Sequence, residues 1–166
     1  MNAIATNDLT VDLPKDKPLI VMTRLFDAPR DLVWKVWTSP EHVAIWWGMT
    51  GAVNKVITYD VRVGGAWRIE SGEGEQKFTF KGTYLEVHPI HKLVNTFGME
   101  GFYEGKELVE THTFEDVDGK TKYTSSTLMD SFEDRQGMVD SGMEFGARQT
   151  MDKLEELLKT LQGDAK

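Results

Sequence analysis

The N-terminal third of the chain contains Phe26-Asp27-Ala28-Pro29-Arg30-Asp31-Leu32-Val33-Trp34-Lys35-Val36-Trp37-Thr38-Ser39-Pro40-Glu41-His42, followed by Trp46-Trp47-Gly48. Four of the chain's five tryptophans lie in this stretch. Pro29 suits a first helical turn, because its fixed φ favours the helix and its missing N–H would have no partner there. Ser39 before Pro40 ends this helix and begins a second one that runs to Trp47. So many large rings on two short helices predict a deep apolar site or a large core patch.

Strand patterns surround these helices. Residues 19–26 are rich in β-branched and apolar side chains and predict a first strand. After the second helix the hydrophobic period changes to two, and Gly82 indicates a bulge or bend. The dipeptide Asp118-Gly119 is typical of a tight hairpin. Because no helical segment intervenes, we expect an antiparallel meander with strands at residues 56–63, 66–70, 76–87, 92–99, 107–116 and 120–128.

A long amphipathic helix is expected from about residue 135 to 161. Its apolar stripe consists of Val139, Met143, Ala147, Thr150, Met151, Leu154, Leu157, Leu158 and Leu161. Gly142 and Gly146 interrupt this pattern, and each costs a helix about 1 kcal/mol relative to alanine. They indicate close contact with a sheet, space for a ligand, or a simple kink. The expected class is α+β: a curved antiparallel sheet wrapped around the long C-terminal helix, with two short helices after the first strand.

Length and composition narrow the classes of protein further. The 166 residues fit one domain, expected at 18–162 between a flexible N-terminal arm at 1–17 and a tail at 163–166. The net charge of −8 argues against nucleic acid and anionic membranes as partners. Cysteine is absent, which excludes disulfides and thiol catalysis. The N-terminus has no pattern of a secretory signal, and no apolar run approaches the roughly 18 residues of a membrane helix, so we expect a cytoplasmic protein.

Several motifs follow one another along residues 18–161. They are Asp27-Ala28-Pro29, Trp37-Thr38, Pro40-Glu41, Trp46-Trp47-Gly48, Asp60-x-Arg62-x-Gly64-Gly65, Gly82-x-Tyr84-x-Glu86-Val87-x-Pro89 and Ser141-Gly142-Met143-Glu144-x-Gly146. In order and spacing the set resembles the START-like (SRPBCC) superfamily, and within it the branch related to the C-terminal domain of the heat-shock protein 90 ATPase activator. This resemblance implies a helix-grip fold with a pocket between the sheet and the C-terminal helix.

The chain departs from that branch at two positions. Met49 follows Trp-Trp-Gly where many relatives have proline, and Ala147 stands where many have tryptophan. A small residue at position 147 would enlarge the cavity or open its mouth. The resemblance therefore implies a fold and a pocket more firmly than an activity, and no ligand identity transfers.

The candidate ligand-binding residues are mostly apolar and aromatic, as such pockets usually are, with a few polar anchors. Which strand residues face the cavity depends on strand parity, because one bulge reverses every later side chain. Of the adjacent pair Trp46 and Trp47, one should pack and the other approach the cavity mouth, and we favour Trp47 for the mouth. The full set is Trp37, Trp47, Trp67, Ile69, Phe80, Tyr84, Thr111, Thr113, Met143, Gly146 and Thr150.

Catalytic and metal sites have weaker support. His88-Pro89-Ile90-His91 lies in a turn and has no evident third ligand, so no metal and no cofactor are expected. For His112, a surface position is favoured over a place inside the pocket. No Gly-x-Ser-x-Gly elbow occurs. We assign no catalytic residue.

The leading hypothesis is a protein that binds a small hydrophobic or aromatic molecule without covalent chemistry. One alternative is a stress-related interaction protein that assists a chaperone, as the resemblance implies. The other is an enzyme like the cyclases and aromatases of the superfamily, with Tyr84 or His112 transferring protons. Whether the chain catalyses a reaction stays open, with binding alone favoured. An edge strand offers a place for a homodimer, although nothing in the sequence specifies one.

Overall fold

The computed structural model describes residues 8–48, 51, 53–101 and 107–163. Two strands, two short helices, six strands and two helices follow one another along the described chain. Their bounds are β1 Thr10–Asp12, β2 Leu19–Phe26, α1 Arg30–Thr38, α2 Pro40–Trp46, β3 Asn54–Tyr59, β4 Ala66–Glu73, β5 Gln76–His88, β6 Lys92–Met99, β7 Leu108–Val117, β8 Lys120–Leu128, α3 Phe132–Asp140 and α4 Met143–Gly163.

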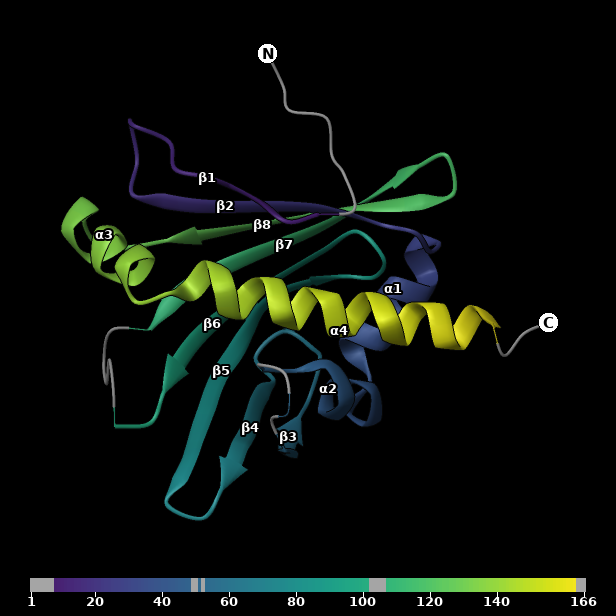
Figure 1. The fold of residues 1–166 in the computed structure, drawn as a ribbon, viewed down its shortest axis with the longest axis horizontal. Helices are drawn as coiled ribbons and strands as arrows, with labels where there is room; N and C mark the ends of the chain where they lie inside the picture. Colours follow the sequence, from purple (N-terminus) through teal and green to yellow (C-terminus); the bar gives the residue numbers. More distant parts are fainter. Residues whose placement is uncertain (1–7, 49–50, 52, 102–106, 164–166) are drawn as a thin grey trace.

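The eight strands form one antiparallel sheet in the order β1-β2-β8-β7-β6-β5-β4-β3. Strands β3 to β8 form the expected meander, and β2 closes against β8, so the first long strand lies beside the last. The turn at Asp118 and Gly119 has positive φ at both residues, 52° and 85°, which is the geometry of a tight hairpin turn. Figure 1 shows the sheet bending around α4.

Helix α4 crosses the concave face of this sheet, while α1 and α2 lie near one end of α4 (Figure 1). The inner face of α4 buries Met151, Leu154, Leu157 and Leu158, the apolar stripe expected from the sequence. Helix α1 likewise buries Val33, Val36 and Trp37. These faces meet the sheet in one hydrophobic core. The architecture is the expected α+β helix-grip arrangement.

The long C-terminal helix is divided, which corrects the expectation of one continuous helix. Helix α3 begins after Ser131, whose side chain accepts a hydrogen bond from the Asp134 N–H at 3.0 Å. Gly142 then adopts φ 89° between α3 and α4, a conformation that favours glycine. A Cβ at Gly142 would meet no atom within 4 Å, so the residue serves the kink and not a close contact with the sheet.

The N-terminal segment is ordered into the sheet where an arm was expected. Strand β1 pairs with β2, and Leu9 is buried in the core. The Arg135 guanidinium of α3 donates hydrogen bonds to the carbonyls of Pro14, Lys17 and Leu19. The folded unit therefore begins before residue 18. Residues 1–7 and 164–166 lie outside the described residues, as does Met49.

Two details of the sheet also differ from expectation. Strand β3 ends at Tyr59, because Asp60 to Gly65 form a turn with a hydrogen bond from the Gly65 N–H to the Arg62 carbonyl. The irregularity in β5 lies between Tyr84 and Glu86, whereas Gly82 keeps regular pairing with β4. Among the described helices, none is long and apolar enough to cross a membrane.

Candidate functional site

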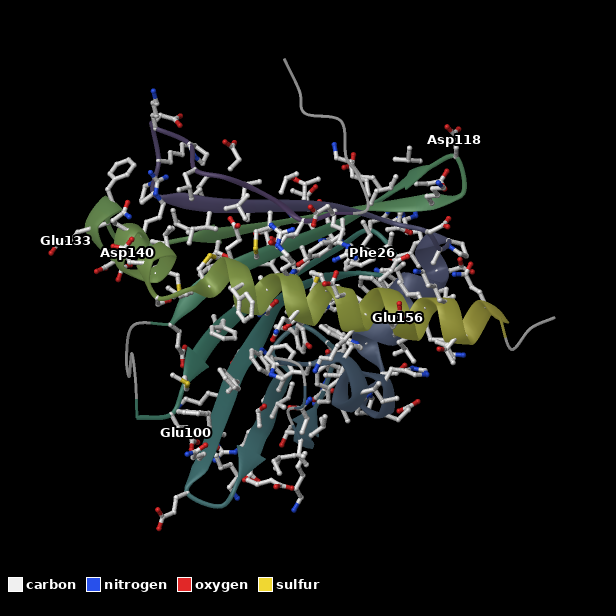
Figure 2. The ribbon with its side chains drawn as sticks, viewed as in Figure 1. Phe26, Glu100, Asp118, Glu133, Asp140 and Glu156 are labelled. Carbon is white, nitrogen blue, oxygen red and sulfur yellow. The ribbon has the colours of Figure 1, made fainter. Side chains whose placement is uncertain are left out.

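A cavity of about 300 Å³ lies between the concave face of the sheet and helices α1 to α4. Figure 2 shows side-chain rings gathered beside α4 over strands β5 and β6. Strands, both short helices and the C-terminal helices all contribute to the wall. The lining residues are Ile20, Met22, Trp37, Trp46, Trp47, Gly48, Tyr59, Trp67, Phe80, Tyr84, Leu93, Asn95, Phe97, Leu108, Glu110, His112, Tyr123, Thr127, Met138, Met143, Ala147, Thr150 and Met151.

The junction of α1 and α2 sets the position of two wall tryptophans. In a continuous helix the Val36 carbonyl would accept from the N–H of residue 40, but Pro40 has none. The Trp46 indole donates to that carbonyl instead, at 2.9 Å, and the ring is buried. Trp47 leaves the helix with extended backbone and is half-buried, and its carbonyl accepts from the Lys153 ammonium of α4 at 3.0 Å. Trp46 therefore packs more deeply than Trp47, although both line the cavity.

An aromatic wall is formed by Trp47, Trp67, Phe80 and Phe97. The Trp47 centroid lies 5.5 Å from that of Trp67 and 6.0 Å from that of Phe80. Phe97 completes the wall, with centroids 5.9 Å from Trp67 and 5.7 Å from Phe80. These spacings are those of favourable aromatic pairs, so the wall offers ring faces and edges to a bound ring.

Gly82 allows Trp67 to occupy this wall. The two residues are opposite each other in the β4–β5 ladder, and the Trp67 indole donates to the Thr96 carbonyl at 3.2 Å. A Cβ at Gly82 would collide with that carbonyl and with the indole itself. The absence of a side chain at Gly82 thus lets the indole lie over the neighbouring strands.

One row of cross-strand partners forms the floor of the cavity. Tyr84 of β5 pairs with Asn95 of β6, which pairs with Glu110 of β7. Glu110 in turn pairs with Thr127 of β8, and Thr127 pairs with Ile20 of β2. All five line the cavity. Side chains in register on one face of a sheet lie side by side, so the polar groups are concentrated in this row.

His112 lies inside the cavity, which corrects the expected surface position. The side chain is buried, and its Nδ1 is 2.7 Å from the Tyr123 hydroxyl. Its Nε2 lies 3.6 Å from a Glu110 carboxylate oxygen. The imidazole stacks on Tyr123 with 5.8 Å between centroids, and it lies 5.5 Å from the Trp37 ring. No cluster of three or more metal-ligating side chains occurs in the described part of the chain.

Three tyrosines of the cavity are held in the neutral form. Burial raises the pKa of Tyr84 to about 12, and the charge of Glu110 adds to this effect. Burial also raises the pKa of Tyr59 and Tyr123 well above the ordinary value. The Tyr59 hydroxyl donates to the Trp37 carbonyl at 2.6 Å. At neutral pH these phenols therefore act as hydrogen-bond donors and not as charged groups.

The roof consists of residues from α3 and α4. Met143, Ala147, Thr150 and Met151 face the cavity from α4, with Met138 from α3. The Thr150 hydroxyl lies 2.9 Å from the Gly48 carbonyl and 3.0 Å from the Gly146 carbonyl, which connects α4 to the segment after α2. The roof is thus apolar and rich in methionine, a side chain that adapts to irregular shapes.

Seven of the eleven expected site residues line this cavity: Trp37, Trp47, Trp67, Phe80, Tyr84, Met143 and Thr150. Four do not. Ile69 is fully buried in the core, and Gly146 contributes a carbonyl to Thr150. Thr111 and Thr113 were placed on the wrong face of β7, because Glu110, His112 and Phe114 alternate with them and point inward.

The sequence reasoning missed the polar floor around Glu110, Asn95 and His112. Polar side chains on an inner face conflict with the usual alternation of apolar and polar residues. The Asp118-Gly119 turn could have predicted the inward position of His112, because it sets the register between β7 and β8. It pairs Val117 with Lys120 and therefore Phe114 with Tyr123. His112 lies two residues before Phe114 on the same strand, so it shares the face of that apolar pair.

Comparisons with known proteins agree with this architecture. The family model described as "Activator of Hsp90 ATPase homolog 1-like protein" matches residues 27–159. A crystal structure of a protein from Rhodobacter sphaeroides is 20% identical, with a TM-score of 0.82, and the match covers 92% of this chain and 99% of that one. A crystal structure from Mycobacterium smegmatis is 23% identical, with a TM-score of 0.79 and coverage of 90% and 95%. A solution structure from Arthrobacter aurescens is 22% identical, with a TM-score of 0.82 and coverage of 91% of each chain.

At these identities the structures show a shared fold and no more. No curated protein matches the sequence.

Proposed function

The chain belongs to the family of activator of Hsp90 ATPase homolog 1-like proteins, of the SRPBCC superfamily, and we propose that it binds a small hydrophobic or aromatic molecule without covalent chemistry. The observation that carries this proposal is the cavity of about 300 Å³ beneath α4. Its walls are mainly rings and aliphatic side chains, with polar groups concentrated on the floor around Asn95, Glu110 and His112. This is the composition of sites that take small molecules, whose volumes begin at about 300 Å³.

The size of the cavity sets the size of the ligand. A volume of about 300 Å³ would hold a planar molecule of about two or three fused rings, with the aromatic wall and the apolar roof at Met143 and Ala147 as its contacts. Burying about 200 Å² of its surface would contribute roughly 5 kcal/mol before the entropy lost on binding. A dissociation constant between about 0.1 and 1 mM is the expected order from this term alone, because about 4.1 kcal/mol corresponds to 1 mM.

Native mass spectrometry tests the proposal directly. The protein is purified gently and its native mass is compared with its denatured mass. An excess of a few hundred daltons that disappears on denaturation would support a bound small molecule and give its mass. If the native mass is that of the bare chain, the same preparation is titrated with N-phenyl-1-naphthylamine, a neutral apolar fluorophore. Absence of both a bound mass and saturable binding would contradict the proposal.

A second candidate function is supported by the contacts of His112. Its two ring nitrogens face the Tyr123 hydroxyl and the Glu110 carboxylate, at 2.7 and 3.6 Å, inside a largely apolar cavity. Nδ1 is held by the Tyr123 hydroxyl, whereas Nε2 is beyond hydrogen-bond distance of Glu110. Nε2 is therefore the atom that would accept and return a proton of a bound molecule, as a cyclase or aromatase requires. Mass analysis of the released ligand before and after incubation tests this. Identical conversion by the parent chain and by His112→Gln would remove the case for proton transfer.

The chaperone-linked alternative rests on the family description alone. Its test is the ATPase rate of purified heat-shock protein 90 with and without the protein, and an unchanged rate would count against it.

A cytoplasmic location and a homodimer remain parts of the proposal. Cell fractionation tests the first, and the same native mass spectra test the second.

A further inference from the structure

The charges around the cavity are unevenly distributed. Among its described lining residues, Glu110 is the only carboxylate, and no lysine or arginine is present. The one basic side chain among those residues is His112, whose Nε2 lies 3.6 Å from a Glu110 carboxylate oxygen. A carboxylate facing an apolar space is unfavourable unless it is paired or hydrogen-bonded. The cavity therefore has a site of negative charge and no lysine or arginine to pair with it.

The contacts of Glu110 leave room for a ligand group. The Asn95 amide donates to Oε1 of the carboxylate at 3.2 Å, and His112 Nε2 lies 3.6 Å from the same oxygen, so both contacts leave Oε2 to a ligand. The Glu110 side chain keeps 23% of its surface exposed. An ionised carboxylate offers about four acceptor positions, and the Asn95 amide occupies one. A donor on a ligand in the cavity thus has free lone pairs to approach.

The potential of Glu110 acts on both sides of the cavity. Besides burial, the charge of Glu110 raises the pKa of Tyr84 on one side and of Tyr123 on the other. The field that disfavours a phenolate at these positions would disfavour a ligand carboxylate or phosphate in the same way. It would favour a cation.

The aromatic wall favours the same kind of ligand. Trp47, Trp67, Phe80 and Phe97 are within aromatic contact of one another, and tryptophan faces attract ammonium groups most strongly. The rings also accept an apolar body by stacking.

From this arrangement we propose that the ligand class is a hydrophobic amine: a planar apolar body on the aromatic wall, with a protonated amine paired to the Glu110 carboxylate. This rests on the proposed function, because it specifies the occupant of the same cavity. The amine donates to Glu110 at the floor row, where Asn95 holds the carboxylate in place. A neutral hydroxyl would make the hydrogen bond without the charge, and an anion would meet repulsion and no lysine or arginine.

Three probes of matched shape test the proposal by calorimetry at pH 7 and physiological salt. They are naphthalen-2-ylmethylamine, naphthalen-2-ylmethanol and 2-naphthoate, which are cationic, neutral and anionic. The expected order of affinity is amine, alcohol, acid. In Glu110→Gln the affinity for the amine should fall by about tenfold or more, because a hydrogen bond between two charged groups is replaced by one to a neutral amide. The affinity for the alcohol should change little.

Glu115→Gln is the matched control. Glu115 lies on the same strand with its side chain exposed, and it does not line the cavity. This variant should bind all three probes as the parent does. If Glu110→Gln does not fold, as judged by circular dichroism, the order of the three probes on the parent chain still decides the question.

The outcomes separate this inference from the proposed function. Binding of 2-naphthoate as tight as that of the amine would overturn the inference, as would an unchanged amine affinity in Glu110→Gln. In both cases the cavity would still bind apolar molecules. Failure of all three probes and of N-phenyl-1-naphthylamine would overturn the proposed function itself.

Discussion

Filling the cavity from α4 is the sharpest test of where the ligand binds. Ala147 lines the roof and is partly buried against the core. In Ala147→Trp an indole of about 200 Å² would enter the space that a two-ring ligand needs. Full burial of such a ligand contributes roughly 5 kcal/mol, so losing one third of it, about 1.7 kcal/mol, weakens binding more than tenfold. The variant should therefore bind N-phenyl-1-naphthylamine at least tenfold more weakly than the parent.

The stability of the same variant is expected to change little. Filling a void gains contacts, and overpacking costs about 1–3 kcal/mol, so the two effects largely offset each other. The melting temperature should stay within roughly 5 °C of that of the parent. Glu156→Trp is the control. Glu156 is exposed on α4 (Figure 2), so this substitution adds the same ring outside the cavity. A folded Ala147→Trp that binds the fluorophore as tightly as this control would refute the placement of the site under α4.

Three further changes address the fold. Gly82→Ala would force a Cβ against the Thr96 carbonyl, and it should lower the free energy of unfolding by about 1–3 kcal/mol in urea titrations. The control Gly137→Ala on α3 adds a Cβ in open space and should raise the free energy of unfolding slightly. Equal effects of the two substitutions would contradict the steric role of Gly82. Trp46→Phe removes the indole N–H that donates to the buried Val36 carbonyl, and it should lower the free energy of unfolding by about 1–3 kcal/mol. A decrease below about 0.5 kcal/mol would contradict a stabilising role of that hydrogen bond. Burial raises the pKa of the Glu155 carboxyl, so the folded state binds more protons than the unfolded state, and this group should lower stability as pH rises from about 4 through the raised pKa. Glu155→Gln should reduce the dependence of the melting temperature on pH in that range. An unchanged pH dependence would exclude Glu155 as its source.

The elements of the sheet could largely be predicted from the sequence, because their signals are local. Strands β2, β6 and β8 begin and end where the pattern of β-branched and apolar residues and the flanking turns indicate, at Leu19–Phe26, Lys92–Met99 and Lys120–Leu128. Helices α1 and α2 follow from Pro29, Ser39 and Pro40. The break at Gly142 was not predicted as the end of a helix, because the apolar stripe continues in phase from Val139 to Met143.

The candidate site was harder to predict, because its polar residues violate the local pattern. Thr111 and Thr113 look like inward polar anchors in a strand, whereas Glu110 and His112 look like solvated ones. Their true placement depends on which face of β7 turns toward the cavity. In the structure Glu110 pairs with Asn95 of β6, and the His112 ring contacts the Tyr123 hydroxyl of β8. Six apolar or aromatic candidates and Thr150 lie together because ring-rich segments from distant parts of the chain share one cavity.

The distribution of tryptophan has a practical consequence. Trp37, Trp46, Trp47 and Trp67 all line the cavity, and only Trp34 does not. Most of the intrinsic ultraviolet emission of the protein therefore originates at the place where a ligand would bind. An aromatic guest that absorbs in the range of indole emission would quench that light by energy transfer over the few ångströms between the rings. Intrinsic tryptophan fluorescence would therefore report binding without an added label, and libraries of compounds can be screened by the loss of this fluorescence.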